Sequence, residues 1–441
     1  MIVNTTIKTV LLEGIKNLLR VISKRITSIK EYLAIKVQPL RHNHALKRLR
    51  IKSKEDKVKV AFFVTHSSVW KYDGVYRLMA QDSRFYPIVV ICPVVNYGRA
   101  NMLEEMRKSY QLFKSKGYNV IKTYTENDDS YLDVKHELKP DIIFYTNPYQ
   151  GLIKDEYYIT NFNDTLTCYV HYAFFVSNLC KEQYDGLFHN VLWKAFYETD
   201  MHKQMAKEYA RNKAKNVIIT GYPGVDGFVY GIRTGEYLWK DSNKSLKRII
   251  WAPHHTIEQE GWLRYSNFLR HYKIMLDLAE EYKDKIQIVF KPHPLLKVKL
   301  FRHKDWGIDK TNNYYKQWED QSNTQLETDQ YIDLFNTSDA MIFDSGSFVA
   351  EYLCCGKPSI FVFADINVKE RFNEFGKLAL DQHYHAYNEI DILRFVDTVV
   401  CEGQDEKKEK RNRFYKRFLE SPNQNTASDN IFELICKEIF K

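Results

Sequence analysis

Four histidines in three places closely follow short apolar runs, which are typical of buried β-strands. They are His171, the pair His254-His255, and His293. A lone histidine after a strand is more often structural, but the carboxyl ends of parallel strands share the edge of the sheet at which α/β proteins bind ligands. A neutral imidazole can take a proton from a hydroxyl group, and a protonated one, with Lys291, can stabilise phosphate charge. The pattern predicts that these histidines face one cleft and act on a hydroxyl and on phosphate groups.

A polar turn, Asp344-Ser345-Gly346-Ser347, follows the apolar run Ala340–Phe343 and precedes a predicted helix over Phe348–Cys355. Helix N-termini present unpaired N–H groups and partial positive charge, Gly346 permits close approach of backbone, and the two serines add hydroxyl donors. We expect the turn to bind the anionic part of a nucleotide-linked donor, with Glu351, one helical turn beyond Ser347, near a ribose. The alternative is an ordinary strand-to-helix turn with Ser347 as N-cap and a solvated Glu351.

Several cofactor and metal motifs are missing from the sequence. No GxGxxG follows the first predicted strand, no GxxxxGK[ST] occurs, and no DxD stands in a strand-end loop. These absences argue against a dinucleotide fingerprint, a P-loop and a metal-held pyrophosphate. The seven cysteines form no CxxC pair, so we expect reduced thiols, a cytosolic compartment, no metal site and no cofactor.

Alternating strand and helix patterns over residues 56–240 predict a first Rossmann-like domain, which would hold the acceptor. The expected strands are Val58–Val64, Tyr86–Cys92, Asn119–Lys122, Asp141–Tyr145, Thr167–Val170 and Val217–Thr220. The expected helices include Trp70–Met79 and Leu103–Lys116.

A second run over residues 241–400 predicts a nucleotide-donor domain of the same kind, joined through a linker at Tyr230–Leu246. Its expected elements are the strands Ile249–Ala252, Ile286–Phe290, Ala340–Phe343 and Ser359–Phe363 and the helix Trp262–Tyr282. Residues 301–330 are expected to be irregular. Residues 401–441 are expected to be helical and to end in an amphipathic helix over Ser428–Phe440, capped by Ser428. The fold class is therefore α/β, with two tandem Rossmann-like domains that face a cleft.

The N-terminal segment, residues 1–55, is basic and amphipathic. Its first 50 residues contain eleven Lys and Arg but only two acids, Glu13 and Glu31, so they account for the formal net charge of +9 of the whole chain. Apolar residues recur at steps of three and four from Val3 to Leu33, and no uncharged run approaches the length of a bilayer span. We expect a helix on an anionic membrane surface and a peripheral, cytoplasmic protein. A helix docked on the body, and less favourably a nucleic-acid contact, are the alternatives.

Five segments occur in the order seen in the CDP-glycerol glycerophosphotransferases: YVHYAFF, ITGYPGVD, IIWAPHHT, FKPHPLLK and SDAMIFDSGSFVAEYLCCGKPSIFV. The resemblance covers about residues 160–375. The family usually has His-Gly-Thr-Pro at His171–Phe174, Ala-Pro-Thr-Trp-Arg at Ala252–Thr256, and Asp-Tyr-Ser-Ser at Asp344–Ser347. Its histidines at His171 and His293 are kept.

This resemblance implies a GT-B fold and a role in teichoic-acid or capsule synthesis. His171 would be the general base for an acceptor hydroxyl that attacks the β-phosphate of a CDP-linked polyol and releases CMP. A polymer or its lipid-linked precursor would be the acceptor, and nucleic acid would not be a partner. The donor would be held by the residues His254, His255, Lys291, His293, Asp344, Ser345, Gly346, Ser347 and Glu351. A GT-B glycosyltransferase that uses a nucleotide sugar, an enzyme similar to UDP-GlcNAc 2-epimerase, and a non-catalytic membrane-docked subunit remain alternatives.

Overall fold

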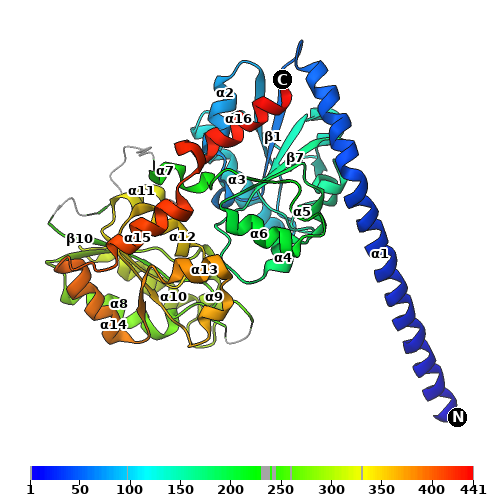
Figure 1. Ribbon diagram of the computed structural model, residues 1–441. Helices are drawn as coiled ribbons and strands as arrows, with labels where there is room; N and C mark the ends of the chain where they lie inside the picture. Colours follow the sequence, from blue (N-terminus) through cyan, green and yellow to red (C-terminus); the bar gives the residue numbers. More distant parts are fainter. Residues whose placement is uncertain are drawn as a thin grey trace.

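The computed structural model describes residues 2–96, 98–229, 239–240, 245–258, 261–328 and 331–440, with the side chains of the first helix from Glu13 on. The predicted linker, Tyr230–Leu246, lies mostly outside these residues. Two α/β domains follow a long N-terminal helix, α1 (Ile2–Lys52), which extends well beyond the body of the protein (Figure 1). The expected tandem Rossmann-like, GT-B-like architecture is confirmed.

The first domain is built on a parallel sheet with the order β3-β2-β1-β6-β7-β8-β9. Its strands are β1 (Val58–Val64), β2 (Phe85–Ile91), β3 (Val120–Lys122), β6 (Ile142–Tyr145), β7 (Leu166–Val170), β8 (Lys194–Tyr197) and β9 (Val217–Ile219). Strand β1 is apolar almost throughout because it lies between β2 and β6 with both of its faces covered. Strands β4 (Tyr124–Thr125) and β5 (Ser130–Tyr131) form a separate small ribbon.

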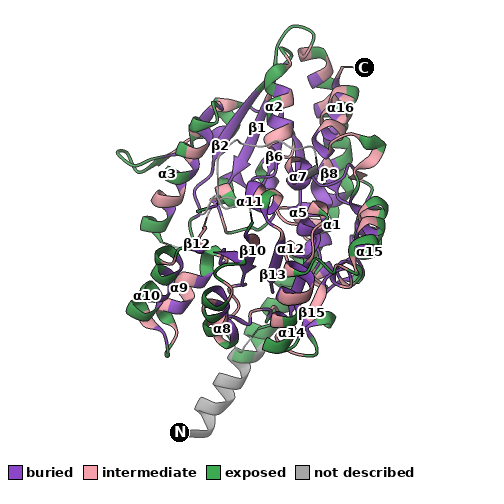
Figure 2. Ribbon diagram, turned by 90° about the vertical axis from the view of Figure 1, so that its left-hand side faces the viewer, coloured by how far each residue is buried: buried purple, intermediate pink, exposed green. Residues whose placement is uncertain are grey.

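The second domain repeats this arrangement with the strand order β12-β11-β10-β13-β14-β15, again all parallel. Its strands are β10 (Lys247–Ala252), β11 (Ile286–Phe290), β12 (Thr324–Leu326), β13 (Ala340–Phe343), β14 (Ser359–Val362) and β15 (Tyr384–Ala386). The central strands of both sheets are buried (Figure 2). The expected strands agree with the observed ones to within two residues at each end, but they do not include β8, β12 or β15.

Helices cover both sheets. In the first domain they are α2 (Asp73–Gln81), α3 (Arg99–Ser115), α4 (Cys180–Tyr184), α5 (Leu187–Val191), α6 (Asp200–Tyr209) and α7 (Asp226–Val229). In the second they are α8 (Phe268–Glu281), α9 (Pro294–Arg302), α10 (Gly307–Asp320), α11 (Ile332–Thr337), α12 (Phe348–Glu351), α13 (Glu374–Leu380) and α14 (Glu389–Arg394). The chain ends with α15 (Lys408–Phe414) and α16 (Ala427–Ile439).

Several expectations about local structure are wrong. Residues 301–330 are not irregular, since they contain α10 and β12. Helix α10 buries Thr311, Tyr314, Tyr315 and Trp318, a helical spacing that its polar composition obscures. Helix α8 begins at Phe268 rather than at Trp262, because the Asn267 N–H donates to the Asp344 carboxylate instead of continuing a helix.

The last helix, α16, returns to the first domain and lies beside α2 (Figure 1). The Asp226 carboxylate accepts the N–H groups of Ala427 and Ser428, both at 3.0 Å, at the start of α16. Thr426 and Asp429 form a capping box there, so the cap is Thr426 and not Ser428 as expected. The contact of Phe440 with Phe85 then fixes the far end of the helix on the first domain.

Helix α1 has two faces with different surroundings. Its last part packs on the first domain through Ile35, Gln38, His42, Ala45 and Leu49, which are all buried. Most of its exposed apolar side chains follow a second series, Ile15, Leu18, Ile22, Ile26, Ile29, Leu33, Val37 and Leu40. Val37 is two residues from Ile35, which is about 200° around a helix with 3.6 residues per turn. The exposed apolar stripe therefore lies opposite the docking face. The helix itself projects past the body of the protein (Figure 1).

We expect truncation of a leucine to destabilise the protein on the docking face but not on the exposed stripe. Leu49→Ala removes a side chain that is 4% exposed and should lower the free energy of unfolding by about 2–4 kcal/mol. Leu18→Ala is the matched control, since Leu18 is 60% exposed, and it should change that energy by less than about 0.5 kcal/mol. Urea unfolding followed by circular dichroism measures both. Equal losses would mean that the stripe packs against the protein.

Candidate active site at the junction of the two domains

His171 follows β7 and forms a buried pair with Glu198, the residue that follows β8. Its Nδ1 lies 2.9 Å from Glu198 Oε1 and 3.1 Å from Oε2, and both side chains are buried. Burial alone would raise the pKa of the Glu198 carboxyl, but His171 and His202 lower it to about 2. An ionised carboxylate only accepts hydrogen bonds, so Nδ1 of His171 carries the proton.

In the neutral ring of His171 the other nitrogen, Nε2, is then the proton acceptor. Nε2 is buried and has no hydrogen-bond partner among the described residues. The ring is held by Tyr197, which stacks on it with 4.4 Å between ring centroids, and by Tyr184 and Phe175. A rigid imidazole with an unused lone pair is the arrangement that a general base requires.

Sequence reasoning did not find Glu198. It stands after the strand β8, in the segment Phe196-Tyr197-Glu198-Thr199, and that strand was not among the expected ones. The signal available in the sequence is an acid directly after an apolar run. Only the pairing of β7 with β8 puts that acid beside His171.

His254 and His293 lie together at the ends of β10 and β11. Their ring centroids are 5.2 Å apart, and His255 lies 4.3 Å from His254 and 4.2 Å from His293. Burial, and then neighbouring His255 and Lys299, lower the pKa of His293 to about 3, and burial holds the pKa of His254 well below its ordinary value. Both rings are therefore neutral at physiological pH.

The hydrogen bonds of these two rings assign their protons. Nδ1 of His293 accepts the Leu295 N–H at 3.1 Å, so its Nε2 carries hydrogen. The Thr256 hydroxyl accepts the N–H groups of Tyr265 and Ser266 at 3.0 and 3.4 Å. Its one hydrogen is then left to donate to Nδ1 of His254 at 2.9 Å, which again leaves Nε2–H. His254 and His293 thus offer neutral N–H donors, which suit an anion.

The same three histidines have the spacing of a metal site, with ligand atoms within 4.8 Å of one another. A metal ion would need a lone pair on Nε2 of His254 and His293. Each ring would then have to move its proton to Nδ1, and the bonds from the Leu295 N–H and the Thr256 hydroxyl would be lost. The hydrogen bonds therefore favour an anion over a cation here. The buried Lys291, in the loop that leads to His293, adds positive charge next to it.

The Asp344–Ser347 turn, which the sequence predicts to bind an anion, makes hydrogen bonds to the protein backbone instead. Asp344 accepts the N–H groups of His254 and Asn267, each at 2.5 Å, and burial raises its pKa to about 7. Ser347 makes no side-chain cap bond, and α12 has only four residues. The space beside Gly346 is filled, because a Cβ there would meet Tyr265 at 3.5 Å and Val176 at 3.8 Å. Ser345 is buried in the same turn.

Glu351 is buried at the domain junction and not solvated. It lies beside Lys71 of the first domain and Tyr331 of the second, and the Lys71 ammonium donates to the Tyr331 hydroxyl at 2.7 Å. Burial raises the pKa of Glu351, while Lys71 opposes that rise. A contact with a ribose stays a prediction.

The residues that follow His171 bring the two sets of site residues together. Val176 contacts the Gly346 position, its carbonyl oxygen accepts the Asn373 N–H at 2.8 Å, and Ser177 pairs with Phe372. Tyr265 also contacts the Gly346 position, and it packs against the His254 ring. The carboxyl ends of β7, β10 and β13 thus meet at one junction.

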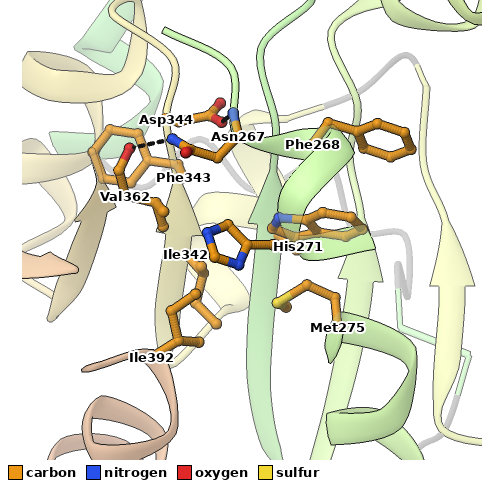
Figure 3. A pocket seen from close by; sticks show the side chains of 10 residues that line it. Asn267, Phe268, His271, Met275, Ile342, Phe343, Asp344, Val362 and Ile392 are labelled. Atoms are coloured by element: carbon orange, nitrogen blue, oxygen red, sulfur yellow. Dashed lines mark hydrogen bonds between the residues drawn. The ribbon is translucent and has the colours of Figure 1, made fainter. Parts of the chain in front are cut away.

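A small cavity lies beneath this junction, inside the second domain (Figure 3). Asp344 and Asn267 lie at one end, and His271 lies among Met275, Ile342 and Ile392. Burial lowers the pKa of His271 to about 4, so its ring is neutral. The mostly apolar lining and the small size make this cavity a packing feature and not a nucleotide site.

Several solved structures share this fold. A variant of the wall teichoic acid polymerase TagF is 16% identical, with a TM-score of 0.57 over 94% of this chain and 98% of that one. The UDP-GlcNAc 2-epimerase from Neisseria meningitidis bound to UDP-GlcNAc is 15% identical, with a TM-score of 0.54 over 86% of this chain and 100% of that one. The S. aureus MnaA–UDP structure is 15% identical, with a TM-score of 0.52 over 87% and 96%. These similarities establish the fold.

Sequence comparison establishes the family. A search of curated protein sequences found no match. The profile of the CDP-glycerol:poly(glycerophosphate) glycerophosphotransferases, however, matches residues 193–437, which is more than half of the chain. The chain therefore belongs to this family of enzymes, which transfer glycerol phosphate from CDP-glycerol to poly(glycerophosphate).

Proposed function

We propose that this enzyme transfers glycerol phosphate to a hydroxyl of a cell-surface polymer or its lipid-linked precursor, and that it releases CMP. The observation that carries the proposal is the pairing of one free proton acceptor, Nε2 of His171, with a cluster of anion-binding donors on the facing domain. Residues 56–240 then form the acceptor domain and residues 241–400 the donor domain.

In this mechanism Nε2 of His171 takes the proton of the acceptor hydroxyl as its oxygen attacks the β-phosphorus of CDP-glycerol. The new P–O bond forms as the bond to the bridging oxygen breaks, and CMP leaves with the electron pair. Nε2–H of His254 and of His293, with the Lys291 ammonium, hold the phosphates and stabilise the charge that develops on them. His255 and the Asp344–Ser347 turn line the donor side of the site, and Glu351 lies beside Lys71 and Tyr331 at the domain junction.

A donor panel tests the activity. Purified protein with a poly(glycerophosphate) acceptor should release CMP from CDP-glycerol and little nucleotide from CDP-ribitol or nucleotide sugars. EDTA should leave the rate unchanged, because we propose that imidazole and ammonium N–H groups, and not a metal ion, bind the phosphates of the substrate. Release of UDP or GDP from a nucleotide sugar would identify a glycosyltransferase instead. Loss of activity in EDTA that Mg²⁺ restores would refute the metal-free mechanism.

The two histidines can be tested separately. His171→Ala and His293→Ala should each lower kcat/KM about a hundredfold or more, the usual loss for a general base or a charge-stabilising donor. His136→Ala is the control, because His136 is exposed and bonds only Asp133 among the described residues. Activity near that of the wild type in either site variant would remove that residue from the mechanism.

We further propose that α1 holds the enzyme on an anionic membrane surface, next to a lipid-linked acceptor. None of the described helices has the length and apolar character needed to cross a bilayer. The segment that carries the uncovered stripe of α1 is instead basic, and Arg25 and Lys30 lie at the two flanks of the stripe. Apolar burial in the interface and roughly 1 kcal/mol for each basic residue near an anionic leaflet would act together.

Removal of residues 1–30 tests this anchor while it keeps the docking face from Ile35 to Leu49. The truncated protein should melt like the full chain and use a soluble acceptor, but it should no longer sediment with phosphatidylglycerol-containing liposomes. The triple variant Ile22→Ser, Ile26→Ser, Ile29→Ser keeps every charge and should also lose binding. High salt should weaken binding of the full chain. Sedimentation of the truncated protein at the wild-type level would place the anchor elsewhere, for example in the basic run Lys407–Arg417.

A further inference from the structure

Glu198 is a buried acid whose ion-pair partners in the described chain are histidines. His171 lies at 2.9 Å and His202 at 3.9 Å, and all three side chains are nearly inaccessible. The carboxylate also accepts the Phe175 N–H at 3.3 Å. A buried carboxylate that stays ionised needs compensation by hydrogen-bond donors or by a nearby positive charge.

His202 is fixed in a form that cannot supply this compensation. Its Nε2 lies 2.9 Å from the Phe175 carbonyl oxygen, which only accepts, so Nε2 carries the hydrogen. Its Nδ1 then accepts the hydrogen of the Thr199 hydroxyl at 2.7 Å. Burial lowers the pKa of His202, which keeps the ring neutral. The negative charge of Glu198 is therefore directed at His171.

We propose that Glu198 is the positioning residue of the transfer reaction, acting through His171. It holds the proton of His171 on Nδ1, which leaves the Nε2 lone pair to face the acceptor hydroxyl. When Nε2 takes the hydroxyl proton, the ring becomes an imidazolium, and the carboxylate 2.9 Å away stabilises the new positive charge. This inference rests on the proposed role of His171 as the general base.

The local fold supports this role, because the end of strand β8 supplies both the residue that stacks on the His171 ring and the residue that bonds it. Tyr197, the last residue of β8, stacks on the His171 ring, and Glu198, the next residue, bonds its Nδ1. The bond from the Phe175 N–H to Glu198 ties the loop after His171 to the same carboxylate. The ring therefore cannot turn without breaking contacts on two sides.

Glu198→Gln tests the inference, since it keeps the shape and removes the charge. We expect kcat to fall about 10²–10⁴-fold, on the scale seen when such an orienting carboxylate is lost, with KM changed less than about twofold. Glu198→Asp keeps the charge and should retain more activity than the Gln variant. Asp185→Asn is the control, because it removes a hydrogen-bonded carboxylate of the same domain that bonds Arg211 and Asn190.

A double variant separates positioning from mere structure. In a His171→Ala background, Glu198→Gln should change kcat by less than about twofold, because a residue that acts through the base has nothing left to act on. A further large loss in that background, or a loss carried by KM, would overturn the inference and make Glu198 a structural residue. If His171→Ala itself stays active, the proposed base fails instead, and the two failures are distinguished.

The wild-type protein offers a measurement that needs no stable variant. ¹⁵N NMR of the His171 ring at neutral pH should show the proton on Nδ1, bonded to Glu198. A ring protonated on Nε2 alone would overturn the inference, because the base would then have no lone pair to offer.

Discussion

Every strand in each main sheet runs parallel to its neighbours, and this constraint determines where the site residues lie. Parallel strands deliver the residues that follow them to one edge of the sheet. In the first domain that edge carries His171 after β7 and Glu198 after β8, and in the second it carries His254, His293 and Asp344 after β10, β11 and β13. The two edges meet where Val176 touches the Gly346 position. Residues from distant parts of the chain therefore share one site without any of them being close in sequence.

Three buried acids at this junction differ in pKa and in hydrogen-bond partners because their surroundings differ. Glu198 is paired with His171 and its pKa is low, Asp344 is held by backbone N–H groups and its pKa is raised, and Glu351 lies beside Lys71 and Tyr331. Desolvation acts on all three, so the nearby charge and the hydrogen-bond donors decide which form is stable. Hydrogen-bond partners likewise determine the tautomers of His254 and His293. These two rings of a histidine cluster with metal-like spacing therefore present N–H donors instead of lone pairs for a metal ion.

The long helix α1 has one face that packs on the first domain and an opposite face that stays exposed. Its docking face adds Ile35 and Leu49 to the core of the first domain, and contacts such as the 2.7 Å ion pair of Lys52 with Asp141 fix its direction. Its exposed stripe starts before the docking face and overlaps the first turns of that face on the opposite side of the helix. Because the stripe is turned away from the body, the rest of the fold does not cover its apolar side chains. In an ordinary docked helix the apolar face is the covered one.

The sequence by itself determined the fold class and most of the strands, because an apolar run covered on both faces, such as Val58–Val64, admits few other readings. It also singled out His171, His254, His255 and His293 as strand-end residues, and five ordered motifs pointed to the family that the profile match establishes. It did not find α10, whose buried aromatic residues are spread through a polar segment, or Glu198, whose meaning depends on the pairing of β7 with β8. Only the tertiary structure decided which nitrogen of His171, His254 and His293 carries the proton, that Asp344 bonds backbone N–H groups, and that the apolar stripe of α1 faces outward. Those outcomes depend on the neighbours that each polar group meets when it is buried, and neighbours distant in sequence are set by the packing of the two sheets.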